Sequence, residues 1–144
     1  MGAHRPRWSG MPTVRTETLD LRSASVVVSV RQIVRTWSIE AGFSLVDQTK
    51  MVTAASELAR NTVDYGGGGT VCLELMTEGI RRGVRVTFQD HGPGIPDIEK
   101  AMQDHYTTGN GLGLGLGGAK RLVNEFDITS RVGEGTRVVI TRWK

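Results

Sequence analysis

Three short segments of this 144-residue sequence combine residue types and spacings that suit phosphate and nucleotide chemistry. In the first segment, Glu57 and Asn61 lie four residues apart in a stretch with helical periodicity, so both side chains point to one face of a helix. Asn61 offers a neutral oxygen of the kind that Mg²⁺ accepts, and Glu57 can orient or deprotonate an attacking hydroxyl group. A solvated polar helix face explains the same pair, so the pair alone leaves both interpretations open.

The second segment runs from Asp90 to Gly94 and follows an expected strand. The carboxylate of Asp90 can accept a hydrogen bond from the exocyclic amine of adenine and would repel the O6 atom of guanine. Gly92 and Gly94 let the backbone approach a planar ring, while Pro93 restricts the turn. A turn initiated by aspartate, without any ligand, accounts for the same residues. His91, between Asp90 and Gly92, is expected to take no part in catalysis.

The third segment, residues 113–118 (GLGLGG), fits the pattern G-x-G-x-x-G. That pattern indicates a dinucleotide site only when it follows a strand within a βαβ unit, and residues 104–110 do not read as a strand. The motifs that accompany the glycine loop of protein kinases are absent, and the Gly-Lys pair of a Walker A motif never occurs. These three kinds of nucleotide site are therefore excluded.

Glycine is unusually frequent, with 19 of 144 residues, about twice the average share. Fourteen of the glycines fall in four clusters, at residues 66–69, 92–94, 109–118 and 133–135. The last three clusters are expected to serve the close approach of backbone to a nucleotide or the turns around it. The cluster at 66–69 is expected only to end a helix and turn the chain into a strand.

Charge and composition limit the possible partners. The net charge is +3, the basic residues are scattered, and there are only 8 aromatic residues, which argues against a nucleic-acid partner. No apolar stretch is long enough for a membrane span, and no secretion signal opens the chain. The single cysteine, Cys72, cannot form an internal disulfide, so a cytoplasmic location is expected.

The periodicity of apolar residues and the turn signals predict one α+β domain. The expected strands are 13–21, 70–77, 84–89, 126–132 and 136–143, and the expected helices are 26–41, 44–65, 97–105 and 116–125. Ser44 and Asp47 have the spacing of a capping box at the start of the second helix. This order predicts a two-layer α/β sandwich with helices on one face of a mixed, largely antiparallel sheet. Residues 1–12 are interpreted as a flexible arm, and residues 13–144 as a single domain.

Taken together and in this order, the motifs resemble those of the GHKL ATPases, the superfamily of gyrase, a heat-shock chaperone, histidine kinases and the MutL protein. The sequence is most similar to the small switch-type serine/threonine kinases and anti-sigma factors of bacterial stress signalling, the stressosome kinases in particular. The matching segments are 56–61 (SELARN), 89–97 (QDHGPGIPD), 111–122 (GLGLGLGGAKRL) and 133–136 (GEGT). The resemblance extends from about residue 14 to the C-terminus and implies a Bergerat-type GHKL ATP-binding fold.

The resemblance also implies roles for individual residues. Glu57 would be the general base or the acid that orients the attacking water, Asn61 would bind Mg²⁺, and Asp90 would bind the adenine amine with support from Thr136. Residues 97–111 would form a lid over the nucleotide. The other cofactor-binding residues implied in this way are Gly92, Gly94, Gly111, Leu112, Gly113, Leu114, Gly115 and Lys120.

Within that set, the backbone N–H groups of Gly111, Gly113 and Gly115 would bind phosphate at a helix N-terminus. Lys120 either neutralises phosphate or faces a protein partner, and both interpretations stay open. Gly117 stands where the stressosome kinases are expected to have proline, and this difference is expected to loosen the loop. The roles of His105 and Tyr106 in the lid are not decided by the sequence.

As a function, the resemblance implies an ATP-dependent serine/threonine protein kinase that uses ATP and Mg²⁺. It would phosphorylate a STAS-domain antagonist or scaffold protein and then be released to activate a PP2C-type phosphatase in bacterial stress and sigma-factor signalling. The alternative is an anti-sigma factor that binds and inhibits a sigma factor under nucleotide control. A domain that binds partners without turning over ATP is a third possibility.

Overall fold

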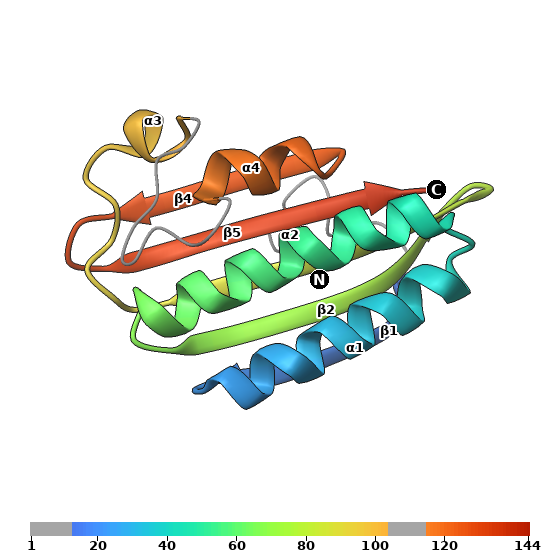
Figure 1. Ribbon diagram of the computed structural model, residues 1–144, viewed down its shortest axis with the longest axis horizontal. Coiled ribbons are helices and arrows are strands. Elements are labelled where there is room, and N and C mark those ends of the chain that lie inside the picture. The colour runs from blue at the N-terminus through green and yellow to red at the C-terminus, as the bar shows by residue number, and fades with distance from the viewer. Residues whose placement is uncertain (1–12, 104–114) are drawn as a thin grey trace, which may run out of the picture.

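The computed structural model of the chain describes residues 13–103 and 115–144, which form a sheet with helices over one of its faces (Figure 1). The predicted two-layer α+β architecture and the order of its elements are confirmed. The elements are β1 (Thr13–Leu21), α1 (Ala24–Glu40), α2 (Leu45–Asp64), β2 (Gly69–Glu78), β3 (Arg81–Asp90), α3 (Ile98–Ala101), α4 (Gly115–Arg121), β4 (Glu125–Arg131) and β5 (Gly135–Trp143). The N-terminal arm expected at residues 1–12 lies outside the described residues.

The five strands are ordered β1-β2-β3-β5-β4, and each of the four neighbouring pairs is antiparallel. Within the described part of the chain the sheet is therefore antiparallel throughout. The prediction of a mixed sheet was wrong in this respect. The reason lies in the long connection from β3 through α3 and α4 to β4. This connection leaves a space between β3 and β4, which run in the same direction, and β5 returns through a hairpin to fill it.

Helices α1 and α2 form because apolar side chains recur along one side of each. In α1 the buried side chains include Val27, Val30, Val34 and Trp37. The predicted cap of α2 is confirmed, because the side-chain oxygen of Ser44 accepts a hydrogen bond from the backbone N–H of Asp47 at 3.1 Å. Helix α1 begins two residues earlier than predicted, after Ser23, whose side chain makes no capping hydrogen bond.

Two predicted boundaries change because strand pairing extends further than local patterns indicate. The turn expected at residues 78–83 shrinks to Gly79 and Ile80, since β3 begins at Arg81, which pairs with Glu78. The helix expected to reach Glu125 ends at Arg121, because Glu125 pairs with Thr141 of β5 and so belongs to the sheet.

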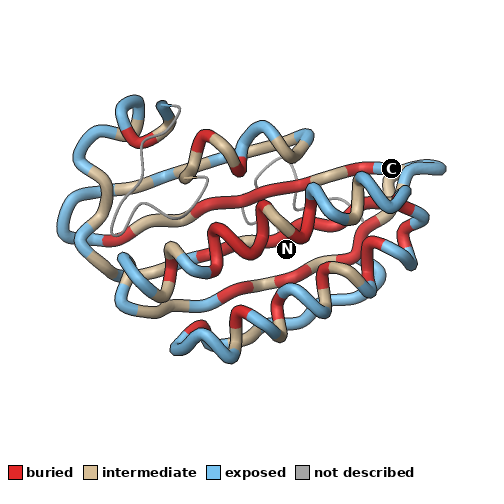
Figure 2. Tube along the Cα trace, viewed as in Figure 1, coloured by how far each residue is buried: buried red, intermediate tan, exposed pale blue. Residues whose placement is uncertain are grey.

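The hydrophobic core lies between the helices and the sheet (Figure 2). Alternate residues of the central strands face it, as Val71, Leu73 and Leu75 do in β2. Helix α4 contributes Ala119 to the same core. Burial of a Val or Leu side chain in this core contributes about 1.5–3 kcal/mol to the stability of the fold. None of the described helices has the length and apolarity needed to span a membrane.

An ion pair joins the two layers. Arg142 of β5 donates to the carboxylate of Asp47 on α2 at 2.6 Å and to the carbonyl of Leu122, which follows α4, at 2.8 Å. The hydrogen bond from Arg142 holds the pKa of Asp47 below its ordinary value. This contact therefore ties the beginning of α2 to the last strand.

Candidate functional site

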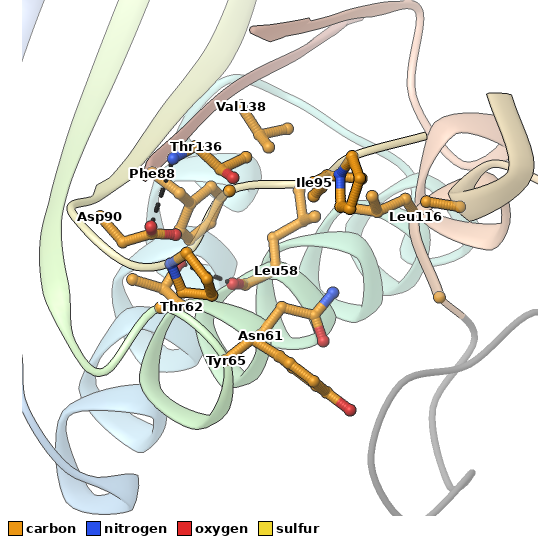
Figure 3. A pocket seen from close by; sticks show the side chains of 16 residues that line it. Leu58, Asn61, Thr62, Tyr65, Phe88, Asp90, Ile95, Leu116, Thr136 and Val138 are labelled. Atoms are coloured by element: carbon orange, nitrogen blue, oxygen red, sulfur yellow. Dashed lines mark hydrogen bonds between the residues drawn. The ribbon is translucent and has the colours of Figure 1, made fainter. Parts of the chain in front are cut away.

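A cavity of about 160 Å³ opens at the end of the molecule where α2 and β3 finish (Figure 3). It is lined by Leu58, Asn61, Thr62, Tyr65, Gly66, Phe88, Asp90, Pro93, Gly94, Ile95, Pro96, Ala101, Gly115, Leu116, Thr136 and Val138. Five of the residues that sequence reasoning proposed for the site lie in this lining, namely Asn61, Asp90, Gly94, Gly115 and Thr136. They come from α2, the end of β3 and the loop after it, α4 and β5.

Asp90 is held in a defined orientation at the end of β3. One carboxylate oxygen, Oδ1, accepts hydrogen bonds from the backbone N–H of Gly92 at 2.9 Å and of Thr136 at 3.2 Å. In Figure 3 the other carboxylate oxygen points toward the interior of the cavity. Since an ionised carboxylate only accepts hydrogen bonds, the group suits a ligand that donates an N–H, as the exocyclic amine of adenine does.

Glycines let three backbone segments meet around Asp90. A Cβ atom on Gly66 would overlap the Asp90 side chain, and one on Gly92 would lie 2.8 Å from the Cα of Gly66. A Cβ atom on Gly135 would overlap the carbonyl of Asp90. The expectation that the cluster at 66–69 only ends a helix was therefore wrong, because Gly66 lines the cavity. Local sequence offered no sign of this contact, which joins residues about 25 positions apart.

A hydroxyl pair supports the wall next to Asp90. The hydroxyl groups of Ser130 and Thr136 lie 2.8 Å apart, and the backbone N–H of Ile95 donates to Ser130 at 2.8 Å. This links the loop after β3 to the hairpin of β4 and β5. Sequence reasoning missed Ser130, although its position three residues before Gly133 places it on the same hairpin as Thr136.

Glu57 and Asn61 both lie on α2, four residues apart, but they have different surroundings. Asn61 lines the cavity, whereas Glu57 does not and is only 4% exposed. The carboxylate of Glu57 accepts from the side chain of Arg60 at 2.9 Å, and its second oxygen lies 3.4 Å from the backbone N–H of Gly115. Glu57 therefore lies directly behind Gly115, a residue of the cavity wall.

A metal bound here would depend on few groups of the chain. The described residues contain no group of three or more His, Cys, Asp or Glu side chains placed to bind a metal ion. A single amide oxygen from Asn61 fits Mg²⁺, which usually keeps several waters and takes its other ligands from substrate phosphates.

The other predicted site residues lie beside the cavity or outside the part of the chain that the structure describes. Gly92 does not line the cavity but holds Asp90 through its N–H. Lys120 is exposed on α4 and does not line the cavity either. Six other predicted residues lie outside the described part of the chain: His105, Tyr106, Gly111, Leu112, Gly113 and Leu114. Of the lid expected at 97–111, the part from residue 104 onward also lies outside it. The earlier part of the lid contains α3, Ile98–Ala101.

Gly117 makes a close contact that the sequence did not predict. It is buried within α4, and a Cβ atom there would overlap the backbone carbonyl of Met102, just after α3. The glycine therefore allows a close approach between α4 and the segment after α3. This contact accounts for glycine at the position, while the loop that the glycine was expected to loosen lies outside the described residues.

The apolar walls of the cavity were not singled out from the sequence. Leu58, Ile95, Leu116 and Val138 line it from four different segments, with Phe88 at its base near Asp90 (Figure 3). Each of these residues fits an ordinary core pattern in its own element. Only their convergence forms an apolar slot that ends in a carboxylate, an arrangement that suits a planar base with a polar edge.

Comparison with known proteins identifies similar sequences and structures. The model of the family described as histidine kinase-, DNA gyrase B- and HSP90-like ATPases matches residues 46–144. The serine/threonine-protein kinase RsbT of Bacillus subtilis is 44% identical over 117 residues, which make up 81% of this chain and 88% of RsbT. The anti-sigma F factor of Anoxybacillus flavithermus is 32% identical over 106 residues, covering 69% of this chain and 71% of that protein.

A solved structure shows the same fold. The crystal structure of the RsbU and RsbW domains of a Mycobacterium tuberculosis protein matches with a TM-score of 0.61 and 25% sequence identity. The match covers 90% of this chain and 32% of that longer chain. The predicted resemblance to switch-type kinases and anti-sigma factors is confirmed by these comparisons.

Proposed function

Because the chain belongs to the histidine kinase-, DNA gyrase B- and HSP90-like ATPase family, we propose that it is an ATP-dependent serine/threonine protein kinase whose substrate is a STAS-domain antagonist protein. In this proposal residues 13–144 act as one cytoplasmic kinase domain. Phosphorylation of the antagonist releases the kinase, which then activates a PP2C-type phosphatase in stress signalling. The similarity to RsbT over most of both chains supports the kinase activity.

The observation that carries the nucleotide assignment is the orientation of Asp90. Two backbone N–H groups hold one of its oxygens, and the other points into an apolar cavity. An adenine ring fits such a site because its faces are apolar and its exocyclic amine donates a hydrogen bond. Guanine presents a carbonyl oxygen at that position, which the carboxylate would repel.

The proposed chemistry is phosphoryl transfer with little covalent involvement of the protein. The acceptor hydroxyl gives its proton to Glu57, a bond forms from its oxygen to the γ-phosphorus, and the bond to the β,γ-bridging oxygen breaks as ADP leaves. Arg60 holds the Glu57 carboxylate in place. Asn61 would hold Mg²⁺, which when bound neutralises phosphate charge.

The direct test is incubation of the purified chain with radiolabelled ATP, Mg²⁺ and STAS-domain proteins from the same genome, followed by mapping of the phosphate. We expect label on a serine or threonine of the STAS protein. The Asn61→Ala variant should lose Mg²⁺-dependent transfer while its circular dichroism spectrum stays unchanged. Full activity of that variant would remove the metal role of Asn61, and unlabelled STAS proteins would contradict the proposed kinase.

A second function is favoured by the anti-sigma F factors among the relatives. In that case the chain would bind a sigma factor under nucleotide control. A pull-down with purified partners separates the two: retention of a sigma factor supports the anti-sigma role, whereas retention of a phosphatase together with a STAS protein supports the switch kinase.

A further inference from the structure

Strand β1 forms one edge of the sheet, and among the described residues no strand pairs with its outer side. In the strand order β1 lies beside β2 alone (Figure 1). The strand has nine residues, and seven of them are exposed. The backbone N–H and C=O groups on the outer side of such a strand can pair with a strand of another chain.

The other edge strand, β4, is covered where β1 is not. The loop after β3 crosses the end of β4: the backbone N–H of Ile95 donates to the hydroxyl of Ser130 at 2.8 Å, and a Cβ atom on Gly94 would overlap the carbonyl of Arg131. Proteins commonly prevent edge pairing with a covering loop, a proline or a bulge. Strand β1 contains no proline, and its only irregularity of register lies before Arg15. Of the two edges, β1 is therefore the one that is open to pairing.

Two charged side chains, Arg15 and Glu17, lie on the side of β1 that faces the helix layer. Arg15 is opposite Leu75 and Glu17 is opposite Leu73, and both leucines are fully buried on that side of the sheet. Arg15 pairs with Glu40 at 2.8 Å, whereas Glu17 has no cation within ion-pair distance among the described residues. Such charges oppose pairing with most strands, because a new neighbour would remove them from water without neutralising them.

A second copy of β1 supplies the opposite charges in one register. When two copies pair antiparallel about a two-fold axis at Thr16, Arg15 of each copy lies opposite Glu17 of the other. Thr16 then lies opposite Thr16 of the second copy on the other face of the sheet. Opposite charges and paired threonines are favourable cross-strand pairs. An axis at Arg15 or Glu17 would place like charges opposite each other, and an axis at Thr18 would place both charges opposite leucine.

We propose that the chain forms a two-fold symmetric homodimer in which β1 pairs with β1 of a second copy, so that the two sheets join into one. The charges favour a second copy over an unrelated strand, because the copy brings a cation to Glu17 and a carboxylate to Arg15. None of the residues that line the cavity comes from β1. The inference is therefore independent of the proposed function.

The test uses two charge reversals that oppose pairing when alone and complement each other when mixed. Glu17→Arg places an arginine opposite Arg15 of the second copy, and Arg15→Glu places a glutamate opposite Glu17. In a mixture of the two variants, opposite charges face each other again at both positions. Asp20→Arg is the matched control, a reversal at an exposed position of the same strand that lies outside the charge pairs. Sedimentation equilibrium of the full chain measures association, and circular dichroism checks the fold.

We expect the unmodified chain and the Asp20→Arg variant to dimerise with similar affinity. Each reversal at position 15 or 17 should weaken dimerisation about tenfold or more, because two attractive pairs become repulsive. An equimolar mixture of Glu17→Arg and Arg15→Glu should form a heterodimer. The inference is overturned if the unmodified chain is monomeric up to its solubility limit, if Glu17→Arg dimerises as well as the unmodified chain, if Asp20→Arg weakens dimerisation as much, or if the folded variants do not associate when mixed.

Hydrogen exchange provides a second measurement that needs only the Glu17→Arg variant, since Arg15→Glu also removes the ion pair with Glu40. In the unmodified chain the backbone amides of β1 should exchange more slowly as the protein concentration rises, because pairing protects the outward N–H groups. This dependence on concentration should disappear in Glu17→Arg. Exchange that is independent of concentration in the unmodified chain, or the same in both proteins, overturns the inference even if the Arg15→Glu variant does not fold.

Discussion

At the scale of single residues, Asp90 is proposed to make the interaction that selects the base. Its Oδ1 atom is already used by two backbone N–H groups, so only the oxygen that points into the cavity remains for a ligand. In the proposed function, selectivity for adenine would therefore depend on one acceptor whose position is set by Gly92 and Thr136. A neutral side chain of the same shape would keep the packing and lose the charge.

The Asp90→Asn substitution is expected to weaken ATP binding by about 10- to 100-fold, because a hydrogen bond to a charged acceptor contributes about 1.5–3 kcal/mol. Titration calorimetry with ATP and with GTP measures the effect, and thermal denaturation serves as the control for folding. The preference for ATP over GTP should also decrease. Unchanged ATP affinity in a folded variant would show that Asp90 does not contact the base.

Arg60 is expected to act as a positioning residue for Glu57. Its side chain lies 2.9 Å from Glu57 and 3.3 Å from the hydroxyl of Ser56, which fixes the carboxylate on α2. Arg60→Gln should lower kcat for STAS phosphorylation by about 10- to 100-fold through misplacement of Glu57, with little change in KM for ATP. Arg60→Lys should restore part of kcat, whereas equal kcat in all three proteins would remove this role.

At the scale of elements, the site depends on how the end of α2 meets the end of β3. Gly66 follows α2, and a side chain there would overlap Asp90, while Gly92 approaches the backbone of Gly66 from the loop after β3. The close packing of these two ends places Gly66 and Asp90 together in the wall of the cavity. The packing of these two elements therefore fixes the contact between Gly66 and the side chain of Asp90.

Gly66→Ala is expected to reduce ATP affinity, because the added methyl group must displace the Asp90 side chain. Gly67→Ala is the matched control: its φ angle of +72° strains a non-glycine residue, but nothing lies within 4 Å of the added atom. The control should lose about 1 kcal/mol of stability and keep its ATP affinity. Calorimetry and thermal denaturation of both variants measure the two effects, and a Gly66→Ala protein that binds ATP normally would contradict the prediction.

At the scale of the whole molecule, the Asp47–Arg142 pair holds the helix layer against the sheet. Only 13% of the Arg142 side chain is exposed, so removal of Asp47 leaves a largely buried cation without its counter-ion. The same pair lies at the end of the molecule opposite the cavity, where α2 begins and β5 ends. Its loss should therefore affect the stability of the fold before it affects the cavity at the opposite end.

Asp47→Asn is expected to lower the thermal unfolding midpoint at pH 7 by a few degrees. Because Arg142 lowers the pKa of Asp47 in the folded chain, the stabilisation is present above the ordinary aspartate pKa of about 4 and is lost as the pH falls below it. The difference between the two proteins should thus begin to shrink as the pH falls to about 4 and continue to shrink as the pH falls through the lower pKa of the folded carboxylate. A difference independent of pH would show that the charge of Asp47 is not what stabilises the fold.

Much of the local structure was predictable because it depends on residues close in sequence. Apolar spacing located the helices and strands, and the cap at Ser44 formed as its sequence indicates. The motif segments pointed to Asn61 and Asp90 and the family resemblance to Thr136, and all three residues line one cavity. Strand ends were less predictable, since Glu125 joins β4 only through its pairing with β5.

The sequence by itself determined the two-layer class, the order of the elements and the chemical groups available for nucleotide binding, since these follow from local patterns and residue types. Only the tertiary structure decided that Gly66 lines the cavity, that Ser130 supports its wall and that Arg60 restrains Glu57. These features rest on contacts between segments far apart in the chain. Such contacts follow from strand register and helix packing, which no local pattern encodes.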